Sequence, residues 1–329
     1  HEPYRRQRQM CIRDRHNTAA YLKHCVESVR NQTLKDIEII LVDNLSSDGS
    51  AQICDDYALM DSRIKTLHLT VAGLSIARNV GIASSVAPYI GFVDSDDWIE
   101  PTMYENLLDA LISYEADMSY CNYCCEYEDG HKEQLYPNSG RIYSLVPKDV
   151  VIDILLDKVS SSSCTKLFRR ELFDIFTFPE GVYYEDHLTV YKWAAQCNRI
   201  SWVDKTYYNY LQREGSICHS SDLKKLYDYF LAEYDRLSFI ENAVFFNEKE
   251  REVLTARVVK HCLWIFNTFI RKPNHTLYKQ EIKAMKLRLR EFLSLPREAL
   301  DLQSYRRLRK ISYFWPMYYL THCSRRNKV

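Results

Sequence analysis

Residues 89–98 read YIGFVDSDDW, an apolar run that passes directly into three carboxylates. Residues 89–93 have the continuous apolar character of a buried strand. Asp94, Asp96 and Asp97 then crowd the end of that strand, and three anions so close repel one another unless cations or hydrogen-bond donors balance them. Carboxylate oxygens are hard ligands that suit magnesium or manganese. The stretch therefore predicts a divalent-metal site at the end of a strand.

Periodic patterns on both sides of this strand predict alternating helices and strands. Apolar residues between Tyr21 and Val29 recur at helical spacing, and residues 37–42 form a second apolar run that ends at Asp43. The alternation continues to about residue 125, which is typical of a largely parallel sheet covered by helices on both faces. Such sheets bind ligands at the carboxyl ends of their strands, where Asp43 and Asp94 are both expected.

The composition excludes several classes of protein. With 329 residues, 46% of them hydrophobic, the chain can bury the core of one large domain or two. Its 44 basic residues balance 44 acidic ones, so no net field attracts nucleic acid, and nucleic acid is not an expected partner. Eleven scattered cysteines fit reduced thiols in a cytosolic protein. The tightest group, Cys121, Cys124 and Cys125, lacks the second pair of a zinc site, so no zinc is predicted.

The C-terminal stretch has an unusual charge pattern. From Leu302 onward there are seven basic residues and no acidic one, and they flank an aromatic run over residues 313–320. One interpretation is a surface that rests on an anionic membrane. The other is a terminal helix that docks on the core and exposes a basic face. We find no signal peptide and no apolar stretch of the ~18 residues that crossing a bilayer requires.

Four motifs occur in a fixed order along the chain: VDNLSSDGS at 42–50, GLSIARNVGI at 73–82, FVDSDDW at 92–98 and YED at 184–186. In this order and spacing they resemble the family 2 glycosyltransferases, over roughly residues 16–220. The resemblance implies the α/β GT-A fold of nucleotide-diphospho-sugar transferases, with a mostly parallel central sheet and helices on both faces. It implies a nucleotide-sugar-binding half at 16–125 and an acceptor-binding half at 126–220. The remaining residues, 221–329, are expected to form a helical C-terminal region.

The resemblance also assigns donor-binding residues. Its nucleotide-sugar, most often a UDP-sugar, would lie across the strand ends with its diphosphate on Mn²⁺ or Mg²⁺. By position, Asp43 and Asn44 would contact the base or ribose, Asp94 the ribose and the metal, and Asp96 the metal itself, with Ser95 also on the donor side. Asn44 stands where the family commonly has a second aspartate. Its side-chain carbonyl can still accept the uracil N–H, but without a charge.

Three further residues are placed on the donor side by the same resemblance. Arg78 and Asn79 belong to the helix that faces the nucleotide, where an arginine can neutralise phosphate through paired hydrogen bonds. The alternative for Arg78 is a partner for the acidic cluster. Lys166 begins a lysine-leucine-aromatic-arginine stretch that matches the family, and a structural role is its alternative.

The second acidic pair, Glu185 and Asp186, has its own chemical rationale. Displacing a nucleotide diphosphate from an anomeric carbon requires the attacking hydroxyl to lose its proton, and a carboxylate on the acceptor side can accept it. Asp186 is the candidate base and Glu185 an orienting residue. Their alternative is a pair of acids that complement the dipole of a helix's first turn. His187, Arg213, Ser216 and His219 are lesser candidates on the acceptor or diphosphate side.

Together these features predict a metal-dependent, inverting hexosyl- or N-acetylhexosaminyltransferase. It would act on a glycan or lipid-linked acceptor in polysaccharide biosynthesis, in the cytoplasm or at the inner face of the cytoplasmic membrane. A catalytically decayed, glycosyltransferase-like binding protein is one alternative. A sugar-nucleotide pyrophosphorylase is another, although we find no glycine-rich phosphate loop with an arginine. A dinucleotide-binding dehydrogenase is disfavoured because no G-x-G-x-x-G follows a predicted strand.

The start of the chain departs from the family pattern. Family members begin with an apolar central strand, whereas residues 1–15 are strongly basic with little apolar alternation. Such a segment would bury unpaired arginines in the middle of a sheet. The sequence therefore predicts that the first strand is missing and that residues 1–15 are a non-native-looking segment.

Overall fold

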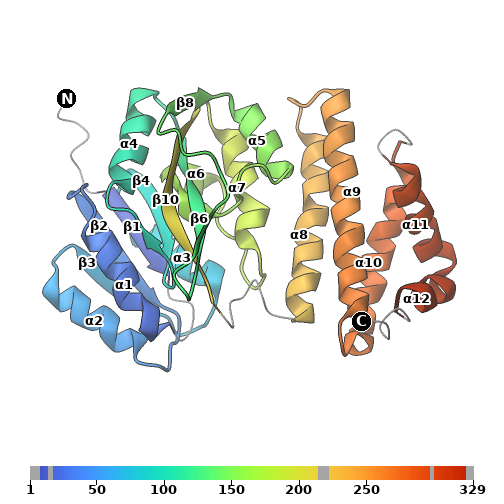
Figure 1. Cartoon of the computed structure of the whole chain (residues 1–329), viewed down its shortest axis with the longest axis horizontal. Coiled ribbons are helices and arrows are strands. Elements are labelled where there is room, and N and C mark those ends of the chain that lie inside the picture. Colours follow the sequence, from blue (N-terminus) through green and yellow to red (C-terminus); the bar gives the residue numbers. More distant parts are fainter. Residues whose placement is uncertain (1–7, 14–17, 214–221, 297–299, 324–329) are drawn as a thin grey trace. The chain divides into compact units, whose positions relative to one another are not determined.

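The protein is represented by a computed structural model that describes residues 8–13, 18–213, 222–296 and 300–323. The chain divides into two compact units, His1–Ile217 and Cys218–Val329. We call them the sheet unit and the helical unit. Each is coherent by itself: the first is built on one twisted sheet with helices on both faces, and the second consists of helices (Figure 1).

The sheet unit alternates strands and helices as the sequence patterns predict. Its elements are β1 (Arg8–Arg13), α1 (Ala19–Arg30), β2 (Ile37–Asp43), α2 (Ser50–Met60), β3 (Ile64–His68), α3 (Leu74–Ala83), β4 (Tyr89–Asp94), β5 (Trp98–Ile99), α4 (Met103–Ser113), β6 (Met118–Tyr127), β7 (Lys132–Gln134), β8 (Ile142–Leu145), α5 (Pro147–Leu155), the 3₁₀ turn η1 (Ser163–Thr165), β9 (Lys166–Arg169), α6 (Leu172–Ile175), α7 (Glu185–Gln196) and β10 (Ile200–Gln212).

The strands follow the order β3-β2-β1-β4-β9-β6-β10-β5, with β7 beside β6 and β8 beside β10. The first four run parallel, and β6 runs parallel to β10. β9 is antiparallel to both its neighbours, β4 and β6. Arg13 of β1 is level with Val42 on one side and Asp94 on the other. The ends of β2 and β4 therefore meet at one edge of the sheet, as expected for a ligand site in a parallel sheet.

The expectation that the first strand is missing is wrong. β1 lies centrally, paired in parallel with β2 and β4 over six and five residue pairs respectively. The physical reason is that a parallel ladder is formed by backbone groups, which any residue except proline supplies. The middle of β1, Met10-Cys11-Ile12, is apolar, and its arginines stand at the two ends. The overall basicity of residues 1–15 concealed this short apolar segment.

β4 is held at a fixed height by the packing of α4 against it. All six of its residues are buried, and Gly91 leaves room for the ring of Tyr104. A Cβ at Gly91 would come within 2.4 Å of Tyr104 Cε1. The Tyr104 hydroxyl also donates to the carbonyl of Phe92 at 3.3 Å. This contact fixes the strand from which Asp94 emerges.

An aromatic cluster fixes α7 against the same sheet. The Trp193 ring is fully buried, with centroid distances of 4.8 Å to Phe173, 4.9 Å to Phe178, 5.5 Å to Phe168 and 5.6 Å to Phe176. Aromatic rings in such contacts contribute large buried areas with defined geometry. The first turn of α7, which carries Glu185 and Asp186, is thereby held in place.

The helical unit contains α8 (Leu223–Asn242), α9 (Glu248–Arg271), the 3₁₀ turn η3 (His275–Leu277), α10 (Lys279–Glu291), η4 (Phe292–Ser294), α11 (Leu302–Tyr313) and α12 (Trp315–Cys323). A capping box between Asn247 and Glu250 starts α9. Contrary to the sequence reading, α9 is long and apolar enough to cross a membrane by length and composition. However, 56% of its most apolar 18-residue window is buried inside the protein. A helix in the core of a protein can have the same length, composition and burial.

Candidate active site

The three carboxylates after β4 are buried, and each is balanced by a different element. Asp94 is 6% exposed, Asp96 1% and Asp97 2%. Asp97 accepts the Tyr208 hydroxyl at 2.6 Å and the backbone N–H of Leu211 at 2.9 Å, both from β10. Tyr208 in turn accepts the N–H of Asp94 at 3.2 Å. Asp97 thus fastens the turn to β10.

Asp96 is paired with Arg213, directly after β10. The guanidinium donates to Asp96 Oδ2 from Nε at 3.2 Å and from Nη2 at 3.0 Å. From the sequence, Arg213 was only a lesser candidate on the acceptor or diphosphate side, and its contact with Asp96 spans 117 residues of the chain. In the folded chain it supplies the positive charge beside the predicted metal ligand.

Arg78 joins the two acidic groups of the site. Its side chain is 2% exposed and lies 3.5 Å from Asp94 Oδ1 and 2.9 Å from Glu185 Oε1, with a third contact to Asp186. Burial by itself lowers the pKa of Arg78, but attraction by Asp186, Glu185 and Asp94 raises it overall. The alternative raised from the sequence, a partner for the acidic cluster, describes its place here. A role at the donor phosphate stays a prediction.

A serine loop holds Asp186 from its other side. The Ser163 N–H donates to Asp186 Oδ2 at 3.1 Å, and the Ser163 hydroxyl lies 3.3 Å from both carboxylate oxygens. Lys166 is fully buried below this loop. Its ammonium donates to the carbonyls of Ser160 at 2.7 Å and Ser162 at 2.6 Å, and burial lowers the pKa of Lys166 to about 8. These bonds give Lys166 the structural role noted as its alternative, while donor binding stays a prediction.

At the end of β2, Asp43 is held in a fixed orientation. Its Oδ1 accepts the N–H of Ser46 at 3.1 Å, and its Oδ2 lies 3.2 Å from His68 Nδ1. The other ring nitrogen of His68 lies 3.0 Å from Asp55. Hydrogen bonds to Asp43 and Asp55 raise the pKa of His68 above its usual value. Next to Asp43, the side-chain oxygen of Asn44 accepts the N–H of Gly73 at 2.8 Å, which ties the β2 loop to the start of α3.

The remaining candidates have local partners. The Asn79 side chain bonds both backbone groups of Phe178, at 2.9 and 3.0 Å. The hydroxyl of Ser95 lies 3.0 Å from that of Thr18, and His187 Nδ1 lies 3.2 Å from the Ser161 hydroxyl. The donor-side roles of Asn79 and Ser95 stay predictions. Ser216 and His219 lie outside the residues that the structure describes.

The acidic turn fits a divalent cation. Asp94 and Asp96 present hard oxygen ligands within one turn, and the charges that balance them here are the two arginines, Arg78 and Arg213. Buried carboxylates that need such compensation are the donor set that Mg²⁺ and Mn²⁺ prefer. Asp97 is the least suited of the three because β10 already engages both of its oxygens.

Sequence reasoning missed three residues that shape the site. They are His68 beside Asp43, Ser163 beside Asp186 and Tyr208 beside Asp97. His68 ends β3, so the rule that located Asp43 and Asp94 at the ends of neighbouring strands could have found it. No short-range signal marks Tyr208, because 111 residues separate it from Asp97.

Comparison with known proteins decides the family. A family model described as glycosyl transferase family 2 matches residues 15–176. The putative glycosyltransferase EpsH of Bacillus subtilis (strain 168) is 33% identical over 272 residues, covering 80% of this chain and 78% of that protein. The chain belongs to glycosyl transferase family 2. The relatives of this family 2 glycosyltransferase include the minor teichoic acid biosynthesis protein GgaA of the same organism, 28% identical over 66% of this chain and 51% of that protein.

A solved structure supports the fold. The crystal structure of S. aureus TarS residues 1–349 in complex with UDP-GlcNAc aligns with a TM-score of 0.75 at 20% identity, covering 97% of this chain and 91% of that chain. At this identity the likeness bears on the fold, and it confirms the predicted GT-A architecture. The family 2 glycosyltransferase described here thus combines a GT-A sheet unit with a C-terminal helical unit.

Proposed function

We propose that this family 2 glycosyltransferase moves a sugar, with inversion, from a nucleotide-diphosphate donor to a hydroxyl of a glycan or lipid-linked acceptor in polysaccharide biosynthesis. One observation carries the proposal. Arg78 contacts both Asp94, at the end of β4, and Asp186, in the first turn of α7. The carboxylate proposed for the leaving-group side and the proposed proton acceptor are therefore both within reach of one guanidinium, which supports their action on a single carbon.

A UDP-sugar is the favoured donor. The TarS crystal contains UDP-GlcNAc, and Asp43 and Asn44 occupy the strand end where a nucleoside would lie. The Asn44 carbonyl oxygen has a second lone pair beyond the one that Gly73 engages, so it can still accept the uracil N–H. The sugar group proposed to be transferred is a hexosyl or N-acetylhexosaminyl group.

Asp94 and Asp96 would hold Mn²⁺ or Mg²⁺. When bound, such an ion supplies Lewis-acid stabilisation to the diphosphate that departs. Arg78 and Arg213, whose guanidinium groups stand at these carboxylates, are suited to contact the phosphate oxygens with paired hydrogen bonds. The protein itself would thus stabilise the departing diphosphate with charged groups that are already in place before the donor binds.

Asp186 is the proposed base. The acceptor oxygen bonds to the anomeric carbon while the bond from that carbon to the diphosphate oxygen breaks, and the hydroxyl proton passes to Asp186. An arginine and a backbone N–H that donate to a carboxylate favour its ionised form, which is the form that accepts a proton. Glu185, 4% exposed and bonded to Arg78, positions the arginine.

The proposed location is the cytoplasm or the inner face of the cytoplasmic membrane. Residues 302–323 hold four basic residues and no acidic one. Nucleotide-sugars and lipid-linked acceptors would meet at such a surface.

Replacing the proposed base tests the mechanism. Asp186→Asn should keep nucleotide binding and reduce release of nucleoside diphosphate from the donor by ~10²–10⁴-fold, the range typical of a lost general base. A panel of nucleotide-sugars, assayed with and without Mn²⁺ or a chelator, identifies the donor and the metal dependence. Asp174→Asn, on an exposed position of α6, is the matched control and should leave turnover unchanged.

The same assay separates the proposal from its rivals. Full turnover in Asp186→Asn would show that another residue is the base. Turnover that a chelator leaves intact would show that the reaction needs no metal ion. Release of pyrophosphate instead of nucleoside diphosphate would indicate a pyrophosphorylase. Donor binding without any turnover would indicate a decayed binding protein.

A further inference from the structure

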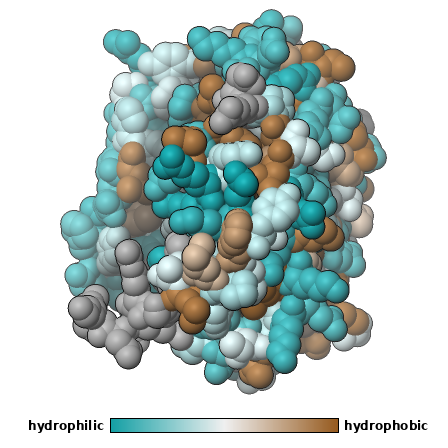
Figure 2. Space-filling view, turned by 90° about the vertical axis from the view of Figure 1, so that its right-hand side faces the viewer, coloured by the Kyte–Doolittle hydropathy of each residue, from teal (hydrophilic) through white to brown (hydrophobic). Residues whose placement is uncertain are grey.

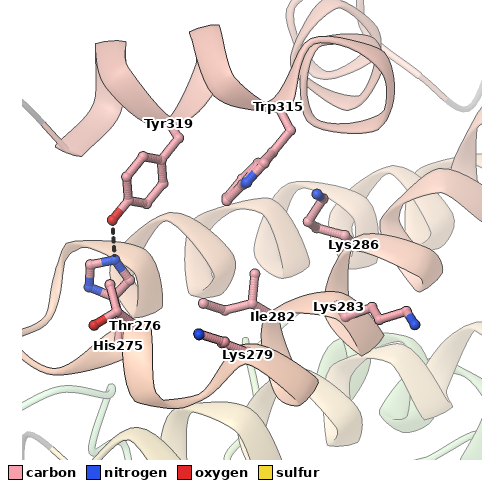
Figure 3. Close-up of a pocket in the computed structure, with 8 residues that line it drawn as sticks. All are labelled: His275, Thr276, Lys279, Ile282, Lys283, Lys286, Trp315 and Tyr319. Carbon is pink, nitrogen blue, oxygen red and sulfur yellow. Dashed lines mark hydrogen bonds between the residues drawn. The ribbon is translucent and has the colours of Figure 1, made fainter.

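A cavity of about 350 Å³ lies within the helical unit, far along the chain from the acidic turn. Figure 3 shows its walls: lysine side chains of α10 on one side, and Trp315 and Tyr319, which hang from α12, on the other. Its lining residues are His275, Thr276, Lys279, Ile282, Lys283, Lys286, Trp315 and Tyr319. The proposed transfer reaction uses none of them.

Three of these residues make the cavity cationic. Lys279, Lys283 and Lys286 follow one another at intervals of four and three along α10, so they share one face of the helix. Like charges at this spacing destabilise a helix slightly. Within the described residues none of the three forms an ion pair with a carboxylate. The repulsion is therefore uncompensated inside the protein, and an anionic ligand would relieve it.

The aromatic wall is preorganised by its own contacts. Tyr318, fully buried, donates its hydroxyl to Asn267 Oδ1 at 2.5 Å and so fastens α12 to α9. The Tyr319 hydroxyl lies 2.7 Å from His275 Nε2. His275 Nδ1 lies 2.8 Å from the carbonyl of Lys272, which can only accept, so Nδ1 carries a hydrogen. In the neutral ring Nε2 then accepts from Tyr319, which fixes that ring at the cavity edge.

Trp315 is oriented by contacts from both sides. Its ring lies 5.7 Å from that of Phe266, and the Lys286 ammonium stands 4.3 Å from the indole centroid. A lysine held over an indole face is attracted by the ring and keeps its ammonium at the cavity. In the part of the chain that the structure describes, the indole N–H has no hydrogen-bond partner. It therefore remains available to an acceptor oxygen.

We propose that this cavity binds the phosphate group of an anionic phospholipid headgroup and so docks the enzyme on a membrane. The Lys286 ammonium lies beside the Trp315 indole (Figure 3), where the two together can meet the oxygens of a phosphodiester. Lys279 and Lys283 add positive charge along the same face of α10. Tryptophan and tyrosine also favour the boundary between headgroups and water, because each ring has an apolar body and a polar tip. The cavity thus combines the positive charge of the α10 lysines with the aromatic rings of Trp315 and Tyr319.

The surroundings favour a lipid phosphate over a free one. α11 carries Arg306, Arg307, Arg309 and Lys310, and neither α11 nor α12 contains an acidic residue, so this surface is attracted to an anionic leaflet. Tyr313, Phe314, Met317 and Leu320 are between 51% and 65% exposed. Figure 2 shows hydrophobic residues in small groups among hydrophilic ones on this face of the helical unit. That distribution suits contact with headgroups rather than deep insertion.

Vesicle co-sedimentation of the full chain tests the proposal. Wild type should bind vesicles of phosphatidylcholine mixed with phosphatidylglycerol and not vesicles of phosphatidylcholine alone. Replacing Lys279, Lys283 and Lys286 together by Gln should weaken binding by roughly a hundredfold, since each lysine near an anionic surface contributes about a factor of five. Trp315→Ala should weaken it further, and Trp315→Phe, which loses the N–H but keeps an aromatic ring, should weaken it less than Trp315→Ala.

A charge-matched variant separates a site from general attraction. Lys35, Lys205 and Lys249 are exposed and lie outside the cavity, and replacing all three by Gln removes the same charge. Equal losses in the two triple variants would overturn the proposal. Saturable binding of inorganic phosphate in the cavity without any binding to vesicles would replace the lipid by a soluble anion. Unchanged thermal midpoints confirm that both triple variants are folded.

Discussion

Arg78 is the residue on which the geometry of the candidate site depends. The Arg78 guanidinium is buried and contacts Asp94, Glu185 and Asp186, so its removal would leave three carboxylates without the cation that they share. It also lies over the ring of Phe178, 4.9 Å from the centroid, so its position is fixed by packing as well as charge. The site is therefore a preformed network rather than a set of independent acids.

At the same scale, His68 should titrate above its ordinary pKa of 6.5, because it bonds Asp43 and Asp55. The stability contributed by these pairs is present at pH below 6.5 and is lost as pH rises through the raised pKa of His68. Asp55→Asn should move the pKa of His68 back down, as read from the imidazole signals in NMR titrations. His68→Gln assigns the signal. An equal change in Asp56→Asn, whose carboxylate bonds Gln52 instead, would contradict the prediction.

The acids of the site were predictable and their partners were not. Asp43, Asp94, Asp96 and Asp186 follow strand ends or begin a helix, which are local patterns that a sequence displays. Their partners come from distant elements: Arg213 reaches Asp96 across 117 residues, and Ser163 reaches Asp186 from a separate loop. No periodicity encodes such contacts, because they exist only once the sheet has formed.

At the scale of elements, β1 shows why the basic charge of residues 1–15 led to a wrong prediction that the first strand is missing. Apart from the two-residue β5, the strands and helices from α1 to α4 were visible in the sequence as apolar patterns. β1 was not visible, because its apolar segment is only three residues long and stands between arginines, which is too short to be recognised as a strand pattern. In the sheet its backbone pairs on both sides, so its place is fixed by ladder hydrogen bonds with β2 and β4. The order of strands thus depends on neighbours more than on the segment's own composition.

A proline in β1 tests its central place. Cys11 pairs with Ile40 on one side and Phe92 on the other, so Cys11→Pro removes a ladder hydrogen bond and should destabilise the sheet unit by ~3 kcal/mol or more. Cys11→Val, which keeps the N–H and suits a strand, should have little effect. Chemical denaturation measures both. A proline variant with the wild-type midpoint would show that β1 is not paired on both sides.

At the scale of the whole molecule, the two units have separate cores and separate candidate sites. The acidic turn belongs to the sheet unit and the lysine-lined cavity to the helical unit. A ligand stabilises only the part of a protein whose folded state it binds. Division of the chain into two units therefore predicts two independent responses to two kinds of change.

Calorimetry of the full chain measures those responses. UDP with Mn²⁺ should raise the midpoint of the sheet unit alone, by a stabilisation of about 2.7 kcal/mol at a hundredfold excess over Kd, and Asp96→Asn should abolish the rise. Tyr318→Ala deletes a fully buried ring in the helical unit and should lower only the other transition, by ~3 kcal/mol or more. A single transition that shifts both with UDP and with Tyr318→Ala would contradict the prediction. It would mean that the two units unfold together, because a ligand or a mutation changes the midpoint of the whole cooperative unit.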